Sequence, residues 1–302
     1  MRFDKTGKII DDFYVLGNAG NPVYLLDGPK PVLFDSGFTA LAPWYEKDIR
    51  KILDGRSPAY LLITHSHFDH VGSAAYLKRL WPEMKIAASA ETGQVLARPR
   101  ALELIRTLNE KAGRMLTTWG VEQPYKGTFE PFELDRALSS GQRFDVGSDL
   151  EIEAISTPGH TRDLMSYWVP GKRILVASEA AGCDDGAGRV WAEFLTDYGD
   201  YRRSLESLSR MDAEILCQGH HLVFTGTDVA DHFRRSLEEA SAYVRRLEEV
   251  LREEEGDVDR TVGKMKAEEW DPKPWPKQMA DAYVLNARAR AKNIWERMQQ
   301  GR

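Results

Sequence analysis

The chain has 302 residues, which is enough for one large domain or for a domain with an appendage. Its formal net charge of -6 at pH 7 argues against a general nucleic-acid or anionic-membrane surface, so we expect a small-molecule substrate and neither of those partners. The first residues lack the apolar centre of a secretory signal, and no apolar run reaches the length of a membrane span. We therefore expect a cytoplasmic protein, and a homodimer stays open.

Short apolar runs alternate with helical patterns in the first two thirds of the chain. Strands are predicted at 13–16, 23–26, 32–35, 60–64 and 85–89, with helices near 44–53 and 72–81. A mostly helical insertion is expected at about 91–140, because apolar residues form one stripe within 99–119. Further strands are predicted at 142–144, 150–156, 164–169, 173–177 and 214–217, with a helix near 202–209. This order predicts a four-layer αββα sandwich of the α/β class.

Strand signals stop after residue 227, and charged residues become frequent. Helices are predicted at 229–254, 258–268 and 277–300, separated by a Gly-Asp pair and by a proline-rich segment. The balanced charges are typical of solvated helix faces with ion pairs four residues apart. We therefore expect an α/β domain at residues 1–227 and a helical C-terminal lid or cap at residues 228–302.

Four potential metal ligands, His65, His67, Asp69 and His70, lie within six residues. Each has a local alternative, since histidines can be satisfied in a core and Asp69 can cap a helix. However, the cluster follows the strand predicted at 60–64 and precedes a helix, and such strand-end loops border the crevice where metals bind in α/β folds. Imidazole and carboxylate ligands suit zinc, iron or manganese better than calcium.

Three more candidate ligands follow other predicted strands, namely His160, Glu179 and His220. Each signal is weak alone, because Pro-Gly-His is a common turn and Glu179 could simply lie near a helix N-terminus. Their shared position after strand ends is harder to explain by chance, and a binuclear metal centre needs more ligands than one loop supplies.

In this order the residues resemble the metallo-β-lactamase-fold hydrolase superfamily, especially its glyoxalase II-like and thioesterase-like branch, over the first 225 residues. The resemblance implies two divalent metal ions as cofactors, zinc first, with iron and manganese as alternatives. It also implies one ligand set for each ion: His65, His67 and His160 for the first, and Asp69, His70 and His220 for the second.

In that superfamily the position of Glu179 supplies a bridging carboxylate and is usually aspartate. The extra methylene of Glu179 leaves three outcomes open: it bridges, it binds one metal ion, or the second site is weakened. Asp35 matches an aspartate that orients the ligand imidazoles from behind. The resemblance implies that Asp69 is the catalytic residue, which orients the attacking hydroxide and accepts its proton.

Within the branch, the chain is most similar to the quinolone-signal-response thioesterases that act on 2-aminobenzoylacetyl-CoA, in its length, its helical C-terminal region and the segment 190–208. The resemblance implies that a metal-bound hydroxide hydrolyses a small-molecule acyl thioester of the acyl-CoA type. A thioester is suitable because a thiolate, with a pKa of roughly 8.5, leaves with little assistance. The alternatives are a lactone or lactoylglutathione hydrolase, and a ligand-binding or effector protein whose metal centre is largely structural.

By the same resemblance, the helical lid would cover the mouth of the metal cleft. Aromatic side chains near it are candidate walls for an apolar acyl group, although core packing is their ordinary role. These candidates are Trp191, Phe194, Tyr198, Trp275 and Tyr283.

Overall fold

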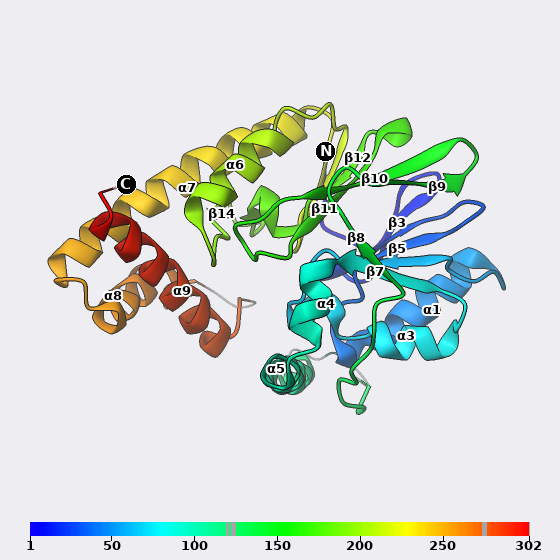
Figure 1. The fold of residues 1–302 in the computed structure, drawn as a ribbon, viewed down its shortest axis with the longest axis horizontal. Helices are drawn as coiled ribbons and strands as arrows, with labels where there is room; N and C mark the ends of the chain where they lie inside the picture. The colour runs from blue at the N-terminus through cyan, green and yellow to red at the C-terminus, as the bar shows by residue number, and fades with distance from the viewer. Residues whose placement is uncertain (119–120, 122–124, 274–276, 302) are drawn as a thin grey trace.

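A computed structural model describes residues 1–118, 121, 125–273 and 277–301, and two seven-stranded sheets face each other within these residues (Figure 1). The first sheet contains, in spatial order, β2 (Gly7–Ile10), β3 (Phe13–Asn18), β4 (Asn21–Leu26), β5 (Val32–Phe34), β6 (Tyr60–Leu62), β7 (Lys85–Ser89) and β8 (Arg136–Leu138). The second contains β1 (Arg2–Phe3), β16 (Val223–Thr225), β15 (Ile215–Cys217), β12 (Ile174–Val176), β11 (Met165–Val169), β10 (Leu150–Ser156) and β9 (Arg143–Gly147).

Parallel pairing in the middle of each sheet brings functional loops together. Strands β5, β6 and β7 are parallel, because α1 (Ala42–Leu53) and α3 (Ala74–Leu80) carry the chain back between them. In the second sheet, β12 and β15 are parallel. The loops that follow parallel neighbours leave the sheet at the same edge, which is where α/β folds place their ligands.

Side-chain alternation along β4 explains why helices cover the outside of the sheet. Tyr24 and Leu26 are buried in the core between the two sheets, whereas Val23 and Leu25 are buried in the core under the outer helices. A strand that is buried on both faces needs a layer on each side. A third core lies between the second sheet and its helices, so the four-layer αββα sandwich predicted from the sequence is confirmed.

The insertion after β7 is helical only in its first part. It contains α4 (Ala90–Leu96) and α5 (Pro99–Thr118), and α5 matches the predicted helix within the described residues. No helix forms at residues 125–135, so the expected helical insertion of about 91–140 was too long. Pro131 removes a backbone donor there. Phe129 is buried in the outer core of the first sheet, and Phe132 and Leu134 pack against it, so this segment is held as extended chain.

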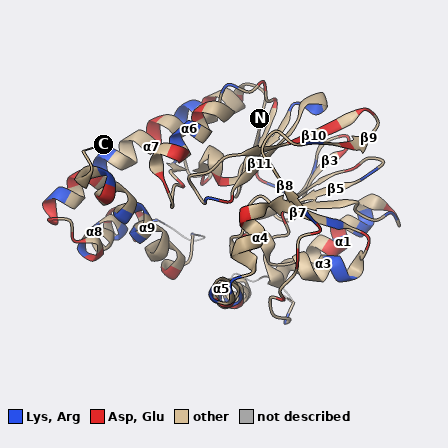
Figure 2. Cartoon of the chain, in the orientation of Figure 1, with Lys and Arg blue, Asp and Glu red and all other residues tan. Residues whose placement is uncertain are grey.

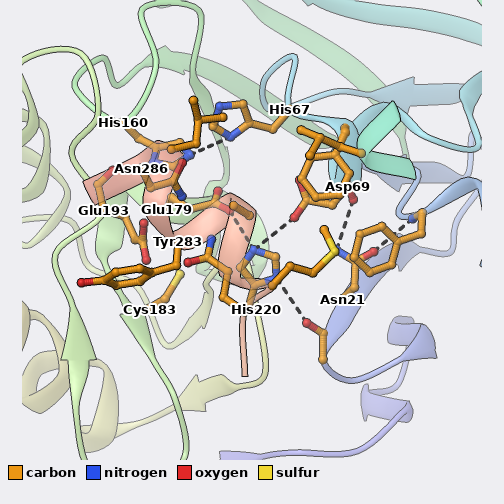
Figure 3. Close-up of a pocket in the computed structure, with 18 of the residues that line it drawn as sticks. Asn21, His67, Asp69, His160, Glu179, Cys183, Glu193, His220, Tyr283 and Asn286 are labelled. Atoms are coloured by element: carbon orange, nitrogen blue, oxygen red, sulfur yellow. Dashed lines mark hydrogen bonds and ion pairs between the residues drawn. The ribbon is translucent and has the colours of Figure 1, made fainter. Parts of the chain in front are cut away.

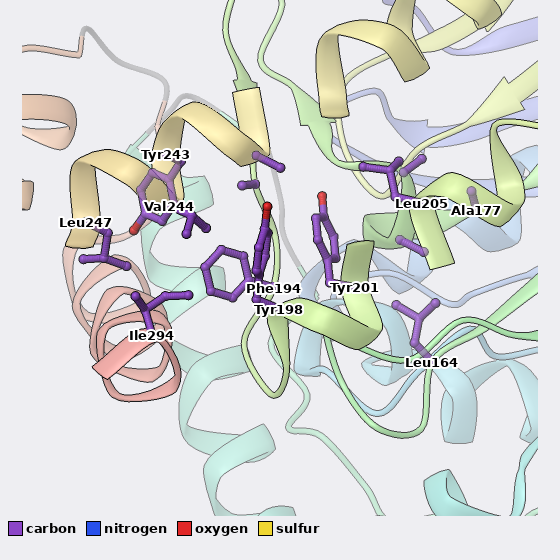
Figure 4. Packing of buried hydrophobic residues seen from close by; sticks show 14 of the residues in the cluster. Leu164, Ala177, Phe194, Tyr198, Tyr201, Leu205, Tyr243, Val244, Leu247 and Ile294 are labelled. Atoms are coloured by element: carbon purple, nitrogen blue, oxygen red, sulfur yellow. The ribbon is translucent and has the colours of Figure 1, made fainter. Parts of the chain in front are cut away.

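The C-terminal helices agree with the predicted ones. They are α7 (Thr227–Glu253), α8 (Val258–Met265) with a π-helical turn at Lys266–Trp270, and α9 (Ala280–Gln299). Tyr243 and Leu247 of α7 and Ile294 of α9 pack with Phe194 and Tyr198 (Figure 4). This core also includes the start of α7 and α6 (Tyr198–Leu208), so α7 extends from the sandwich into the cap. The boundary at residue 227 stays a prediction.

Positive and negative side chains are interspersed along the cap helices (Figure 2). Arg234 pairs with Glu238 and Arg252 pairs with Glu248, each four residues apart on α7, as the sequence predicted. No helix in the described residues is both long and apolar enough to cross a membrane.

Short elements complete the fold. They are 3-10 turns at Thr39–Leu41, Pro170–Lys172 and Ser178–Ala181, the one-turn helix α2 (Phe68–Val71), and a ribbon of β13 (Cys183–Asp184) and β14 (Val190–Trp191).

Candidate metal centre

The loop between β6 and α2 brings three histidine rings together. The ring centroids of His65 and His67 lie 4.6 Å apart, and those of His65 and His70 lie 4.2 Å apart. His65 is fully buried and follows the last residue of β6 by three positions, whereas His70 lies in α2. Because the chain turns between the strand and the helix, the three imidazole rings gather together. In a continuous strand, successive side chains would alternate between the two faces of the sheet.

His160 joins this loop from the end of β10, in the other sheet. Its Nε2 lies 3.0 Å from His67 Nδ1, and its ring centroid lies 5.0 Å from that of His65. His65, His67 and His160 each offer a nitrogen atom within 4.8 Å of the other two. These are the three residues expected to hold the first metal ion.

Asp69, His70 and His220 form a second group with ligand atoms within 4.8 Å of one another. His220 follows β15, and its Nε2 lies 3.5 Å from Asp69 Oδ2. The Nδ1 atom of the same ring faces the carbonyl oxygen of Gly20 at 3.2 Å, which directs Nε2 toward the group. These are the three residues expected to hold the second metal ion.

Glu179 lies between the two groups, in the 3-10 turn after β12. Its Oε1 is 3.0 Å from His70 Nε2 and 3.2 Å from His220 Nε2, and its Oε2 is 3.9 Å from His65 Nε2. The Ser178 hydroxyl donates to the same carboxylate. A Cβ atom at Gly219 would lie 2.5 Å from Glu179 Oε1, so the longer side chain is accommodated by a neighbouring glycine.

Asp35 supports the ligand loop from behind. One carboxylate oxygen accepts from the Thr64 backbone N–H at 2.7 Å, and the other contacts the Thr64 hydroxyl at 2.9 Å and His70 Nδ1 at 2.8 Å. Asp35 has a left-handed backbone with φ of 62°, an unusual conformation that the surrounding contacts maintain. These contacts agree with the orienting role that the resemblance implied.

The buried charges of the site favour a bound cation. Burial disfavours a charged ring, yet the carboxylates of Glu179 and Asp35 raise the pKa of His70 well above its usual value. Burial and the nearby His70 lower the pKa of His65, and burial lowers the pKa of His160 to about 3, whereas Glu179 raises the pKa of His220 despite its burial. His65 Nε2 is buried without a hydrogen-bond partner among the described residues, which a metal bond would satisfy.

A cavity of about 1310 Å³ opens onto both groups, since His67 and His160 of the first and Asp69 and His220 of the second line it. Its wall includes Tyr283 and Asn286 of α9. Asn286 lies near His160 and Glu179 (Figure 3), whereas the Tyr283 hydroxyl donates to Glu269 of the cap. Of the five aromatic candidates, Trp191 and Tyr283 line the cavity. The expectation was wrong for Phe194 and Tyr198. Their side chains point into the core under the cap, where they are buried. Trp275 lies outside the described residues.

A contact with the cap was not anticipated from the sequence. The backbone carbonyl of Glu193 contacts His160 Nδ1, and the Glu193 carboxylate binds Arg290 of α9. Arg290 is only 2% exposed. The one available signal was its position on an apolar stripe of α9 with Ala287 and Ile294, where a charge requires a partner.

The chain belongs to the metallo-β-lactamase superfamily, whose family model matches residues 17–220. Members of this superfamily typically bind divalent metal ions, and the histidine-rich groups described above are suited to hold them.

Two curated relatives and one solved structure illustrate the similarity. Glyoxylase B2 of Dictyostelium discoideum is 28% identical over 44% of this chain and 39% of its own length. The atrochrysone carboxyl ACP thioesterase of Aspergillus fumigatus is 21% identical over 83% of this chain and 62% of its own length. The chain thus spans less than two thirds of either relative. A metallo-β-lactamase family protein from Thermus thermophilus has the same fold, with a TM-score of 0.64 and 18% identity, covering 99% of this chain and 94% of that one. The narrower resemblance to quinolone-signal-response thioesterases stays a prediction.

Proposed function

We propose that this protein is a metal-dependent hydrolase that cleaves an acyl thioester. The observation that carries the proposal is the convergence of seven potential ligands from loops of both sheets, five of which line a large cavity. The family match and the similarity to relatives named as a glyoxylase and a thioesterase support the same chemistry.

Two divalent metal ions are proposed as cofactors, with zinc favoured and iron and manganese as alternatives. His65, His67 and His160 would hold one ion, and Asp69, His70 and His220 the other. Of the three outcomes left open for Glu179, a role in holding both ions is the one we propose, and it is supported by Oε1 facing His70 and Oε2 facing His65. When bound, such ions polarise a carbonyl group and make water a nucleophile at neutral pH.

The protein's own residues would then orient the reactants. Asp69 faces the cavity and is close enough to His220 for both to contact the same ion, so its carboxylate is positioned to orient the attacking water and accept its proton. The water oxygen bonds to the acyl carbon, the carbon–sulfur bond breaks, and the products are a carboxylate and a thiol. The thiolate leaves readily because its pKa is roughly 8.5.

A panel of acyl-CoA esters, lactoylglutathione and acyl-homoserine lactones tests the proposal on metal-loaded protein. We expect the acyl-CoA esters to be hydrolysed fastest, and an Asp69→Asn variant with retained metal to lose at least about a hundredfold in kcat. If only lactones or only lactoylglutathione were turned over, the protein would be a lactone hydrolase or a lactoylglutathione hydrolase instead.

A second candidate is a ligand-binding or effector protein with a largely structural metal centre, which Glu179 favours because this position is usually aspartate. A Glu179→Asp variant separates the candidates when assayed on the same panel. Tight ligand binding without turnover in the native protein, together with a large gain of activity in the variant, would favour the effector role.

A further inference from the structure

One face of α5 forms an apolar wall along the cavity. Six apolar residues of this helix line it, namely Ala101, Leu104, Ile105, Leu108, Met115 and Leu116, of which Ile105 and Leu116 are also buried in the outer core of the first sheet. The stripe rises about 22 Å along the helix axis. A stripe of this length on a helix normally faces a protein core. Here Leu104 remains 49% exposed and lines the cavity.

The C-terminal cap places a second apolar wall on the same cavity. Met279, Ala282 and Leu285 line it at the start of α9, and Leu285 is also 49% exposed. Apart from Met1, Leu104 and Leu285 are the large apolar side chains that are exposed among the described residues. Exposed apolar surface that gathers in one concave place marks a binding site for an apolar ligand.

An ion pair between Lys111 of α5 and Asp281 of α9 links the two helices. Lys111 is the charged exception on the apolar stripe, since it lies one turn beyond Leu108. The ion pair thus connects the two walls and gives Lys111 a partner.

The apolar wall is continuous with the candidate metal centre. Asn109 of α5 donates from its side-chain nitrogen to the carbonyl oxygen of Phe68 at 2.8 Å, and Phe68 stands between the ligands His67 and Asp69. A molecule whose reactive carbonyl lies at the ligands therefore has the middle of the α5 wall beside it, about 12 Å along the helix axis from Ala101.

We propose that the cavity between α5 and α9 binds a long aliphatic acyl chain, so that the substrate is a fatty acyl thioester. The inference rests on the proposed thioester hydrolysis and names its acyl class. From Asn109 the wall extends about 12 Å toward Ala101, and a compact aromatic acyl group would cover only part of that length. An extended chain follows the wall past Leu104 and can also contact Leu285 of the second wall.

The test is a chain-length series of butanoyl-, octanoyl-, dodecanoyl- and hexadecanoyl-CoA, combined with calorimetric binding of dodecanoate. We expect KM to fall by up to about fourfold for each added methylene until the wall is covered. Leu104→Gln and Leu285→Gln should each flatten this dependence and weaken dodecanoate binding at least about tenfold. Both side chains are half exposed, so these variants are expected to fold.

Glu103→Gln is the matched control, because Glu103 is exposed on α5, pairs with Arg106 and does not line the cavity. It should keep the native chain-length dependence. Thioester turnover with equal KM for all chain lengths, or with a preference for benzoyl-CoA, would overturn the inference and leave the proposed hydrolysis standing. Dodecanoate binding that both glutamine variants abolish, without thioester turnover, would support the apolar site and overturn the proposed hydrolysis instead.

Discussion

Arg290 of α9 donates from Nη2 to Glu193 Oε2 at 2.7 Å, and the carbonyl of the same Glu193 contacts the ring of His160. The two charged residues are 97 positions apart in the chain. The cap is therefore joined to a candidate metal ligand through a single intervening residue, and the position of α9 bears on the geometry of the site.

Replacing Arg290 with methionine should destabilise the fold and weaken metal binding together. The substitution leaves Glu193 without its buried partner, for which we expect a loss of about 3 kcal/mol in the free energy of unfolding. His160 loses its fixed orientation, so metal affinity should fall by roughly tenfold. Urea unfolding and metal titration measure the two effects.

Arg288→Met on the same helix is the control for Arg290→Met. Arg288 is exposed and pairs with the exposed Asp259, so its loss should change stability by less than about 1 kcal/mol. Equal effects of the two substitutions would show that the contact with Glu193 has no special part in the site.

Gly219→Ala should disturb the site because a Cβ atom there would lie 2.5 Å from Glu179 Oε1. We expect a loss of about 1 to 3 kcal/mol in stability from this crowding. In the double variant with Glu179→Asp, the shorter side chain should recover most of the loss. A double-mutant cycle by thermal unfolding gives the coupling, and strictly additive effects would contradict the packing argument.

Metal content should follow the two ligand groups. We expect two ions per chain in the native protein and one in His160→Ala or in His220→Ala, since each substitution removes a ligand from a different group. His232→Gln is the control, because this histidine lies outside both groups. Elemental analysis after dialysis measures the ratio, and loss of both ions in either ligand variant would mean that the two sites form only together.

Chelation should also lower the melting temperature, since ligands that bind only the folded state stabilise it.

His232 should make the fold sensitive to acid independently of the metal centre. Its burial against Phe224 lowers its pKa to about 4, whereas an unfolded histidine titrates near 6.5. Because the unfolded chain binds the proton more tightly, stability should be full above roughly pH 6.5 and fall by up to about 3 kcal/mol as the pH approaches 4. Unfolding at several pH values checks this, and His232→Phe should remove that part of the slope.

Local patterns were sufficient to predict the ligand loops. A strand end followed by His65, His67, Asp69 and His70 has few explanations other than a metal-binding loop. The layers followed from alternation between strands and helices. The contact between Arg290 and Glu193 could not be predicted, since it depends on how α9 packs after the chain has left the sandwich. Aromatic residues such as Phe194 failed as wall candidates for a related reason. Their type shows that they are buried, but not whether a cavity or a core receives them.

The two apolar walls of the cavity come from widely separated parts of the chain. Helix α5 follows β7 of the first sheet, and α9 follows β16, the last strand of the second sheet. Neither helix therefore lies in the sequence between a strand and the ligand loop that follows that strand. Both helices also contact the ligand loops, α5 through Asn109 and Phe68, and α9 through Arg290 and Glu193. A change in either helix should therefore alter the shape of the cavity and the support of the candidate metal ligands together.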